Sequence, residues 1–125
     1  MGSSGQETVT LRAINGLKKP TFDITTTVQC QASTTLLDIM QLAADQDTQF
    51  RFIVKYFDKT LGYYVLGING AVCDYDQDKM FWQILDGNGE PTTVGVSSYI
   101  PWDGETVTFK IVQDQEGQQE GQCPA

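Results

Sequence analysis

The sequence predicts an α+β fold with mostly antiparallel strands and one covering helix. Most apolar residues alternate with polar ones, which is the period of a strand with one buried face. A single stretch, about residues 34–45, carries apolar residues at helical spacing instead. The strands come in groups around this helix, an order typical of α+β rather than of a parallel α/β sheet. Two strands, a helix and further strands suit a β-grasp-like arrangement.

The chain opens with a predicted β-hairpin. Val9, Leu11 and Ala13 share one face of a strand over residues 8–14, and Asn15-Gly16 is a turn signal. The second strand follows Pro20, and its alternating residues are Phe22, Ile24, Thr26, Val28 and Cys30.

The helix is predicted to begin after Ser33, a good N-cap residue. Its apolar stripe comprises Leu36, Leu37, Met40 and Ala44, widened by Ile39 and Ala43. A lone helix of about three turns is not stable in water, so this stripe must cover a sheet.

Further strands follow the helix. Phe50, Phe52, Val54 and Tyr56 alternate, and residues 62–68 form a second strand, which Asn69-Gly70 ends. Of the adjacent Tyr63 and Tyr64, only one can face the core.

The last part of the chain predicts a strand, a hairpin and a strand. Met80, Trp82 and Ile84 alternate, and the Gly and Asn residues of 86–89 predict the tip of a projecting hairpin over about 82–96. A short strand and then a turn at Asp103-Gly104 are predicted next. The last predicted strand covers residues 106–112 and has Val107, Phe109 and Ile111 on one face.

Composition excludes several classes of function. The chain has 125 residues, of which 40% are hydrophobic, enough for one domain. A net charge of −8 argues against nucleic acid and anionic membranes as partners. The chain contains no histidine, GxSxG motif or phosphate loop, so we expect no enzyme. No apolar run is long enough to span a bilayer.

Three segments are predicted. Residues 1–5, MGSSG, resemble an expression leader, residues 6–113 form the domain, and residues 114–125 form a polar tail expected to be disordered.

The three cysteines match no metal motif. One disulfide with an odd thiol and three free thiols are both compatible with the sequence. If a bridge forms, it is expected between Cys30 and Cys73, because Cys123 lies in the polar tail.

Asp74, Asp76 and Asp78 match the first three ligand offsets of an EF-hand loop. The match then fails, since Lys79 stands where Gly is needed and Leu85 where a Glu is needed. The run is therefore predicted to be a solvated acidic turn, with a weak, irregular calcium site as the alternative.

An ordered set of motifs resembles the C-terminal β-domain of the transcobalamin and intrinsic factor family of cobalamin carriers. The matching positions, spread over about residues 7–112, are Gly62, Gly70, Phe81-Trp82-Gln83, Gly95, Tyr99, Pro101 and Asp103-Gly104-Glu105.

The resemblance implies binding of cobalamin as the ligand, without catalysis, by a secreted protein. In that family the corrinoid lies between a helical-barrel domain and this β-domain, so a barrel domain and a cell-surface receptor are implied partners. The implied contact residues are Tyr64, Leu66, Gly67, Trp82, Thr92, Thr93 and Val94. Thr92 and Thr93 stand where the carriers have bulky aliphatic residues.

Two alternatives remain open. Trp82 has a second interpretation, as a core residue. The second interpretation of the whole domain is a stand-alone extracellular module that uses the same scaffold to bind a protein or glycan and does not bind a corrinoid.

Overall fold

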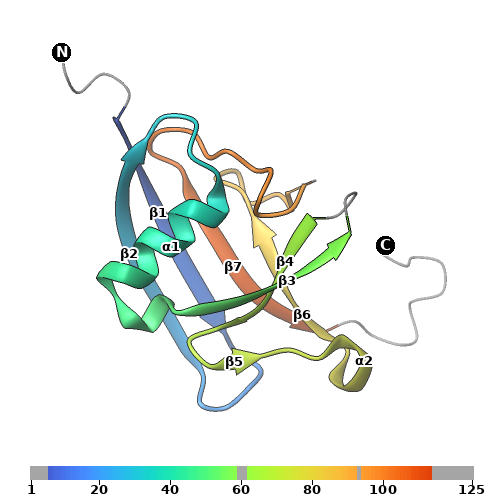
Figure 1. The fold of residues 1–125 in the computed structure, drawn as a ribbon. Coiled ribbons are helices and arrows are strands. Elements are labelled where there is room, and N and C mark those ends of the chain that lie inside the picture. The colour runs from blue at the N-terminus through green and yellow to red at the C-terminus, as the bar shows by residue number, and fades with distance from the viewer. Residues whose placement is uncertain (1–5, 59–61, 93, 114–125) are drawn as a thin grey trace.

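The computed structural model describes residues 6–58, 62–92 and 94–113, and it confirms the α+β fold (Figure 1). The larger sheet has four strands in the order β2-β1-β7-β6. Strand β1 (Gln6–Asn15) pairs antiparallel with β2 (Phe22–Gln31) and parallel with β7 (Thr106–Gln113). Strand β6 (Met80–Leu85) pairs antiparallel with β7 at one edge. The predicted opening hairpin and last strand are confirmed.

The smaller sheet is antiparallel, in the order β3-β4-β5. It consists of β3 (Phe52–Asp58), β4 (Gly62–Ile68) and the two-residue β5 (Ala71–Val72). The register between β3 and β4 shifts between Ile53 and Val54 and again between Tyr56 and Asp58. Helix α1 (Leu36–Gln46) connects the two sheets, followed by the 3₁₀ turn η1 (Thr48–Phe50).

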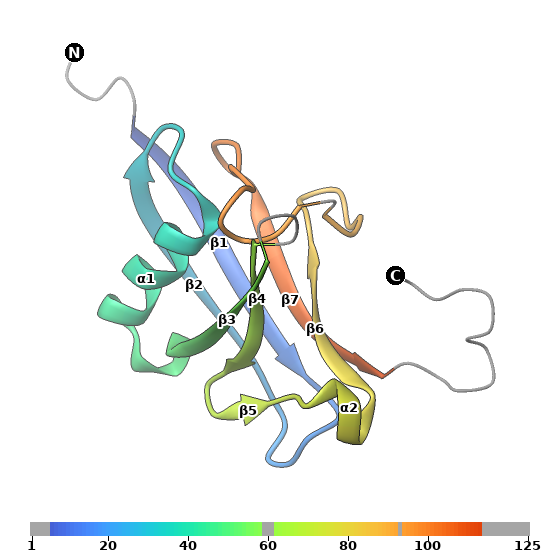
Figure 2. The same ribbon diagram turned by 45° about the vertical axis from the view of Figure 1, so that its right-hand side comes forward.

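The core lies on one face of the larger sheet. Val9, Leu11 and Ala13 of β1 are fully buried, and so are the inward residues of β7, whereas the alternate residues point to the other face. Helix α1 and the smaller sheet lie in front of this sheet in both views (Figures 1 and 2). The buried residues of α1 are Leu36, Ile39, Met40 and Ala43. The helix and the smaller sheet thus share one core with the larger sheet.

The helix begins two residues later than a cap at Ser33 would require. Ser33 has a positive φ of 69°, whereas Thr35 has the extended conformation of an N-cap and its hydroxyl accepts a hydrogen bond from the Asp38 N–H. Leu36 and Leu37 donate their N–H groups to the carbonyls of Tyr99 and Val96. The prediction of Ser33 as the N-cap is therefore wrong, because a distant loop fixes where the first turn begins.

Three predictions for the strands and the hairpin also need correction. Phe50 is a buried residue of η1, not of a strand, and β3 begins at Phe52. The hairpin after β6 is shorter than expected: Pro91 bridges to Leu85 and Thr92 donates to the Ile84 carbonyl. The short strand expected before Asp103 is a series of turns.

The expected bridge between Cys30 and Cys73 is absent, and both are free, buried cysteines. Cys73 follows β5 beside the turn between β1 and β2, where Lys18 and Asp78 influence its pKa. Phe22 begins β2 next to that turn, and Cys30 lies near the other end of the strand. At about 3.3 Å per residue, the two positions are about 26 Å apart. A disulfide requires Cα atoms within about 7 Å.

The acidic run forms a short helix, α2 (Tyr75–Asp78), rather than a simple turn. Asp78 forms an ion pair with Lys18, with 2.7 Å between Oδ2 and Nζ, and its Oδ1 atom accepts a hydrogen bond from the Met80 N–H. Among the described residues, no three His, Cys, Asp or Glu side chains are grouped as a metal site would need.

The predicted leader and polar tail, and Cys123 with them, lie outside the described residues. No helix in the described part of the chain has the length and apolar character to cross a membrane.

Candidate ligand-binding surface

The loops of residues 86–92 and 94–105 meet at one end of the molecule, called here the loop end; it is uppermost in Figure 1. The carboxylate of Glu105 lies at its centre and is 1% exposed. Its Oε2 atom accepts hydrogen bonds from the Tyr99 hydroxyl at 2.6 Å and the Gly87 N–H at 2.8 Å. Its Oε1 atom accepts one from the Trp102 N–H at 3.0 Å. One buried carboxylate therefore links three separate turns.

Tyr99 and Glu105 are both desolvated by this arrangement. Burial raises the pKa of the Tyr99 phenol, and the hydrogen bond to Glu105 raises it further. The phenol therefore stays protonated and acts as a hydrogen-bond donor. Glu105 accepts three hydrogen bonds and has no ion pair among the described residues, so hydrogen bonds satisfy this buried group.

The loop end is also fixed to the sheet below it. Gly104 donates its N–H to the Thr8 carbonyl at 2.7 Å, and Asp103 accepts from the Thr8 N–H at 2.9 Å. The Glu105 carbonyl accepts from the Thr10 N–H. These bonds hold the turn before β7 against the start of β1, so the loops form a preorganised surface.

The turn after β6 has little freedom. Asp86 Oδ1 accepts from the N–H groups of Asn88 and Glu90, which closes the tip. A Cβ atom on Gly87 would lie 2.7 Å from the Trp102 ring and 2.8 Å from the Glu105 side chain. Only glycine fits beneath these two residues.

Tyr64, Leu66 and Gly67 lie on β4, whose first residue, Gly62, is next to the loop end and whose last residues lead into the turn to β5. Tyr64 is 40% exposed, Leu66 is half-buried and Gly67 is buried. Val72 covers Gly67, since a Cβ there would lie 2.8 Å from a Val72 methyl group. Tyr63 is exposed as well, so neither adjacent tyrosine is a core residue.

The start of β4 adjoins the loop after the hairpin. A Cβ on Gly62 would lie 3.0 Å from the Ser97 hydroxyl, so the chains touch there. Val94 is 45% exposed and Thr92 is half-buried, while Thr93 lies outside the described residues. The structure thus places the start of β4 beside the loop after the hairpin, through Gly62 and Ser97.

Trp82 differs from the other predicted contact residues, because its side chain is 5% exposed. The indole Nε1–H donates to the Ala71 carbonyl at 3.0 Å, and the ring stacks on Phe22 with centroids 6.3 Å apart. Its role in this structure is core packing between β6, β5 and β2.

The sequence analysis did not identify Glu105 as the centre of the loop end. The signal was present in the Tyr-x-Pro and Asp-Gly-Glu motifs, which the structure joins through the Tyr99–Glu105 hydrogen bond. Trp102, 46% exposed on the same loops, was also missed.

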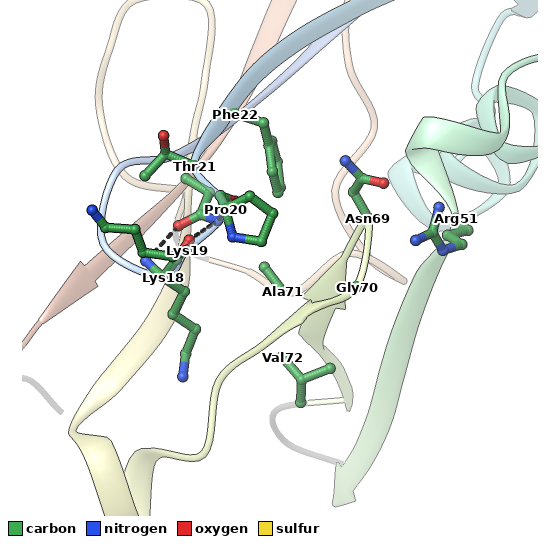
Figure 3. Close-up of a pocket in the computed structure, with 11 residues that line it drawn as sticks. Lys18, Lys19, Pro20, Thr21, Phe22, Arg51, Asn69, Gly70, Ala71 and Val72 are labelled. Carbon is green, nitrogen blue, oxygen red and sulfur yellow. Dashed lines mark hydrogen bonds between the residues drawn. The ribbon is translucent and has the colours of Figure 1, made fainter.

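A separate cleft of about 770 Å³ lies at the opposite end of the molecule, between the β1–β2 turn and the β4–β5 turn (Figure 3). It shares none of the predicted contact residues. Lys18, Lys19 and Arg51 contribute positive charge to its lining.

Comparison with known families matches residues 33–113 to a model described as "Domain of unknown function (DUF4430)". No curated protein matches the chain.

Solved structures give a more informative comparison. The crystal structure of haptocorrin in complex with Cbi matches with a TM-score of 0.70 and 21% identity, covering 86% of this chain and 26% of that chain. A candidate metal-binding protein from Ruminococcus gnavus ATCC 29149 matches with a TM-score of 0.59 and 12% identity, covering 87% of this chain and 99% of that chain. The chain therefore spans about a quarter of haptocorrin, and the likeness shows a cobalamin-carrier-like fold. The first neighbour is thus described as a complex with Cbi and the second as a metal-binding protein.

Proposed function

Because the chain belongs to the DUF4430 family and has a cobalamin-carrier-like fold, we propose that it is a non-catalytic ligand-binding domain that contributes half of a corrinoid site. The observation that carries the proposal is the match of most of this chain to haptocorrin, a protein solved with Cbi bound. Cobalamin is the proposed ligand.

The proposed contact surface comprises Tyr64, Leu66 and Gly67 of β4 together with Thr92, Thr93 and Val94 after the hairpin. A corrin ring is a broad apolar plate edged with amides, so its binding wall needs exposed apolar groups and nearby backbone polar groups. Tyr64 and Val94, 40% and 45% exposed, supply apolar area. Trp82 supports this surface from the core, because its hydrogen bond to the Ala71 carbonyl holds β6 against β5.

The rigidity of the loop end favours binding. Ordering a loop on binding costs free energy, and a preorganised surface avoids that cost. The hydrogen bonds to Glu105 and the contacts to helix α1 hold the loops before any ligand arrives.

A helical-barrel domain, in the same or another chain, is the proposed second half of the site, with secretion and a cell-surface receptor as further expectations from the resemblance. A tether between two such halves supplies an effective concentration of order millimolar. Without it, the whole cost of association falls on this domain. The isolated domain is therefore expected to bind cobalamin no more tightly than tens of micromolar, about 6 kcal/mol.

The proposal is tested by titrating cobalamin and cobinamide against the domain, alone and mixed with a separately made barrel domain from a carrier. Visible absorbance is expected to change weakly with the domain alone and strongly with the mixture. Val94→Asp should abolish the change. The matched control is Leu42→Asp, because Leu42 is similarly exposed, at 40%, but lies on helix α1. No spectral change in either titration would contradict the corrinoid assignment.

A second candidate function is a protein- or glycan-interaction module on the same scaffold. It is favoured by the edge-to-face pair of Tyr56 and Tyr63, with ring centroids 5.2 Å apart and side chains 50% and 36% exposed. Exposed aromatic rings are common in such interfaces. Binding to a glycan or protein that Tyr56→Ala abolishes, with no corrinoid binding, would favour this function.

A further inference from the structure

We propose that the cleft between the β1–β2 turn and the β4–β5 turn binds a small organic anion, a carboxylate or phosphate monoester attached to a flat apolar body. The cleft lies at the end of the molecule opposite the loop end (Figures 1 and 3). The inference therefore does not depend on corrinoid binding.

The charge of the lining is opposite to that of the whole chain. The chain has a net charge of −8, yet the cleft is lined by three of its 8 Lys and Arg residues and by no acidic residue. Lys18 is already neutralised by its ion pair with Asp78. Lys19 and Arg51 remain to provide the positive potential.

The two cations belong to different walls of the cleft. Lys19 comes from the β1–β2 turn, and Arg51 lies just before β3, next to the β4–β5 turn (Figure 3). The side chain of Lys19 has no hydrogen bond or ion pair with any other described residue. Arg51 uses one N–H to bond the Thr48 carbonyl at 3.1 Å, and its other N–H donors have no partner in the described part of the chain. An arginine has five such donors in a planar fork that matches carboxylate and phosphate oxygens.

Arg51 is held in position by its surroundings. Its carbonyl accepts from the Asn69 N–H at 2.9 Å, which joins it to the β4–β5 turn. Its Nη2 atom lies 3.3 Å from where a Cβ on Gly70 would be, so the guanidinium lies directly against that turn. A fixed guanidinium loses little freedom when it binds an anion.

The floor of the cleft is apolar and rigid. Pro20 and Phe22 line it from one wall and Ala71 from the other. Trp82 joins the two walls from beneath, because it stacks on Phe22 and donates to the Ala71 carbonyl. A volume of about 770 Å³ lies within the range of small-molecule sites. An aromatic or alkyl body on this floor would have its anionic group at the rim of the cleft, within the positive potential of the basic lining residues.

The test uses NMR titration of the whole ¹⁵N-labelled chain with phenyl phosphate and with benzoate. Both ligands are expected to shift the amide resonances of Lys19, Asn69 and Gly70, and binding should weaken as salt is raised. Phenol, which has the same body without the charge, and inorganic phosphate, which has the charge without the body, should both bind more weakly.

Two double variants complete the test. Lys19→Gln with Arg51→Gln should weaken phenyl phosphate binding about tenfold or more, that is, by about 1.4 kcal/mol. Lys55→Gln with Lys110→Gln removes the same charge outside the cleft and should leave binding unchanged. If the Arg51 change disturbs the fold, Lys19→Gln alone provides the comparison, because its side chain supports no other described residue. Absence of shifts at the cleft, equal binding of phenol, or equal weakening by both double variants would overturn the proposal.

Discussion

The hydroxyl of Tyr99 donates a 2.6 Å hydrogen bond to the carboxylate of Glu105, and this bond joins the loop that caps helix α1 to the turn that begins β7. Glu105 is 1% exposed and has no basic partner among the described residues. A buried carboxylate is stable only when its hydrogen bonds are satisfied. The arrangement of the loop end therefore depends on the hydrogen bonds to Glu105.

Glu105→Gln is expected to lower the free energy of unfolding by about 2 kcal/mol, because an amide donor replaces one acceptor oxygen that faces N–H and O–H groups. Tyr99→Phe should cost about 1 kcal/mol, since it removes one bond and leaves two. Urea denaturation measures both. Glu90→Gln is the control, because that side chain is exposed. A Glu105→Gln variant as stable as Glu90→Gln would show that the carboxylate is not required.

The two tryptophans should differ in fluorescence. Trp82 is 5% exposed and Trp102 is 46% exposed. The Trp102→Phe variant, which retains Trp82, should emit at shorter wavelength and resist quenching by acrylamide. The Trp82→Phe variant should emit at longer wavelength and be less stable by about 1 to 2 kcal/mol, since it loses the bond to Ala71. Equal quenching of the two variants would be inconsistent with a buried Trp82.

Cys30 and Cys73 are expected to react slowly with thiol reagents in the folded protein. Both are buried, and burial raises the pKa of each thiol, that of Cys73 to about 11. The thiolate is the reactive form, so a raised pKa and burial act together. In a Cys123→Ser background, Ellman's reagent should detect two thiols after unfolding and very little before it. An unfolded sample with no free thiol would instead demonstrate a disulfide.

The Cys73 pKa also predicts a pH dependence of stability. The folded-state pKa of about 11 lies above the ordinary value of 9.0, so the folded state holds a proton that the unfolded state releases between these values. Stability should therefore fall as the pH rises from about 9 towards 11, with no effect of this thiol below that window. Thermal denaturation of the wild type and of Cys73→Ala should show a shallower decline in the variant. Parallel declines would contradict the prediction.

Thr92→Leu with Thr93→Leu should strengthen cobalamin binding by about tenfold, because apolar area replaces hydroxyl groups on the proposed contact surface. The absorbance titration measures the change. Thr25→Leu with Thr27→Leu is a matched control at exposed positions of β2, at the opposite edge of the larger sheet from β6. A gain in both double variants would indicate non-specific apolar binding.

Much of the fold could be predicted because strand and helix periods are local. Val9, Leu11 and Ala13 alternate within their own strand, and each is buried as the pattern predicts. The helix start could not be predicted, because the carbonyls of Val96 and Tyr99 fix it across a long sequence separation. The same holds for the hydrogen bond from the Gly87 N–H to the Glu105 carboxylate, which joins residues 18 positions apart in the chain.

The sequence alone determined the α+β class, the strand faces and a set of motifs that resemble a carrier domain, since these depend on residue type and spacing. Only the tertiary structure decided what the individual residues do. The sequence pattern around Trp82 is compatible both with a core residue and with a ligand contact. In the structure its indole lies in the core and donates to the Ala71 carbonyl. Lys19 and Arg51 are far apart in the chain, and only the packing of the two turns places them on one cleft. Burial and proximity are properties of the folded chain, so local patterns do not contain them.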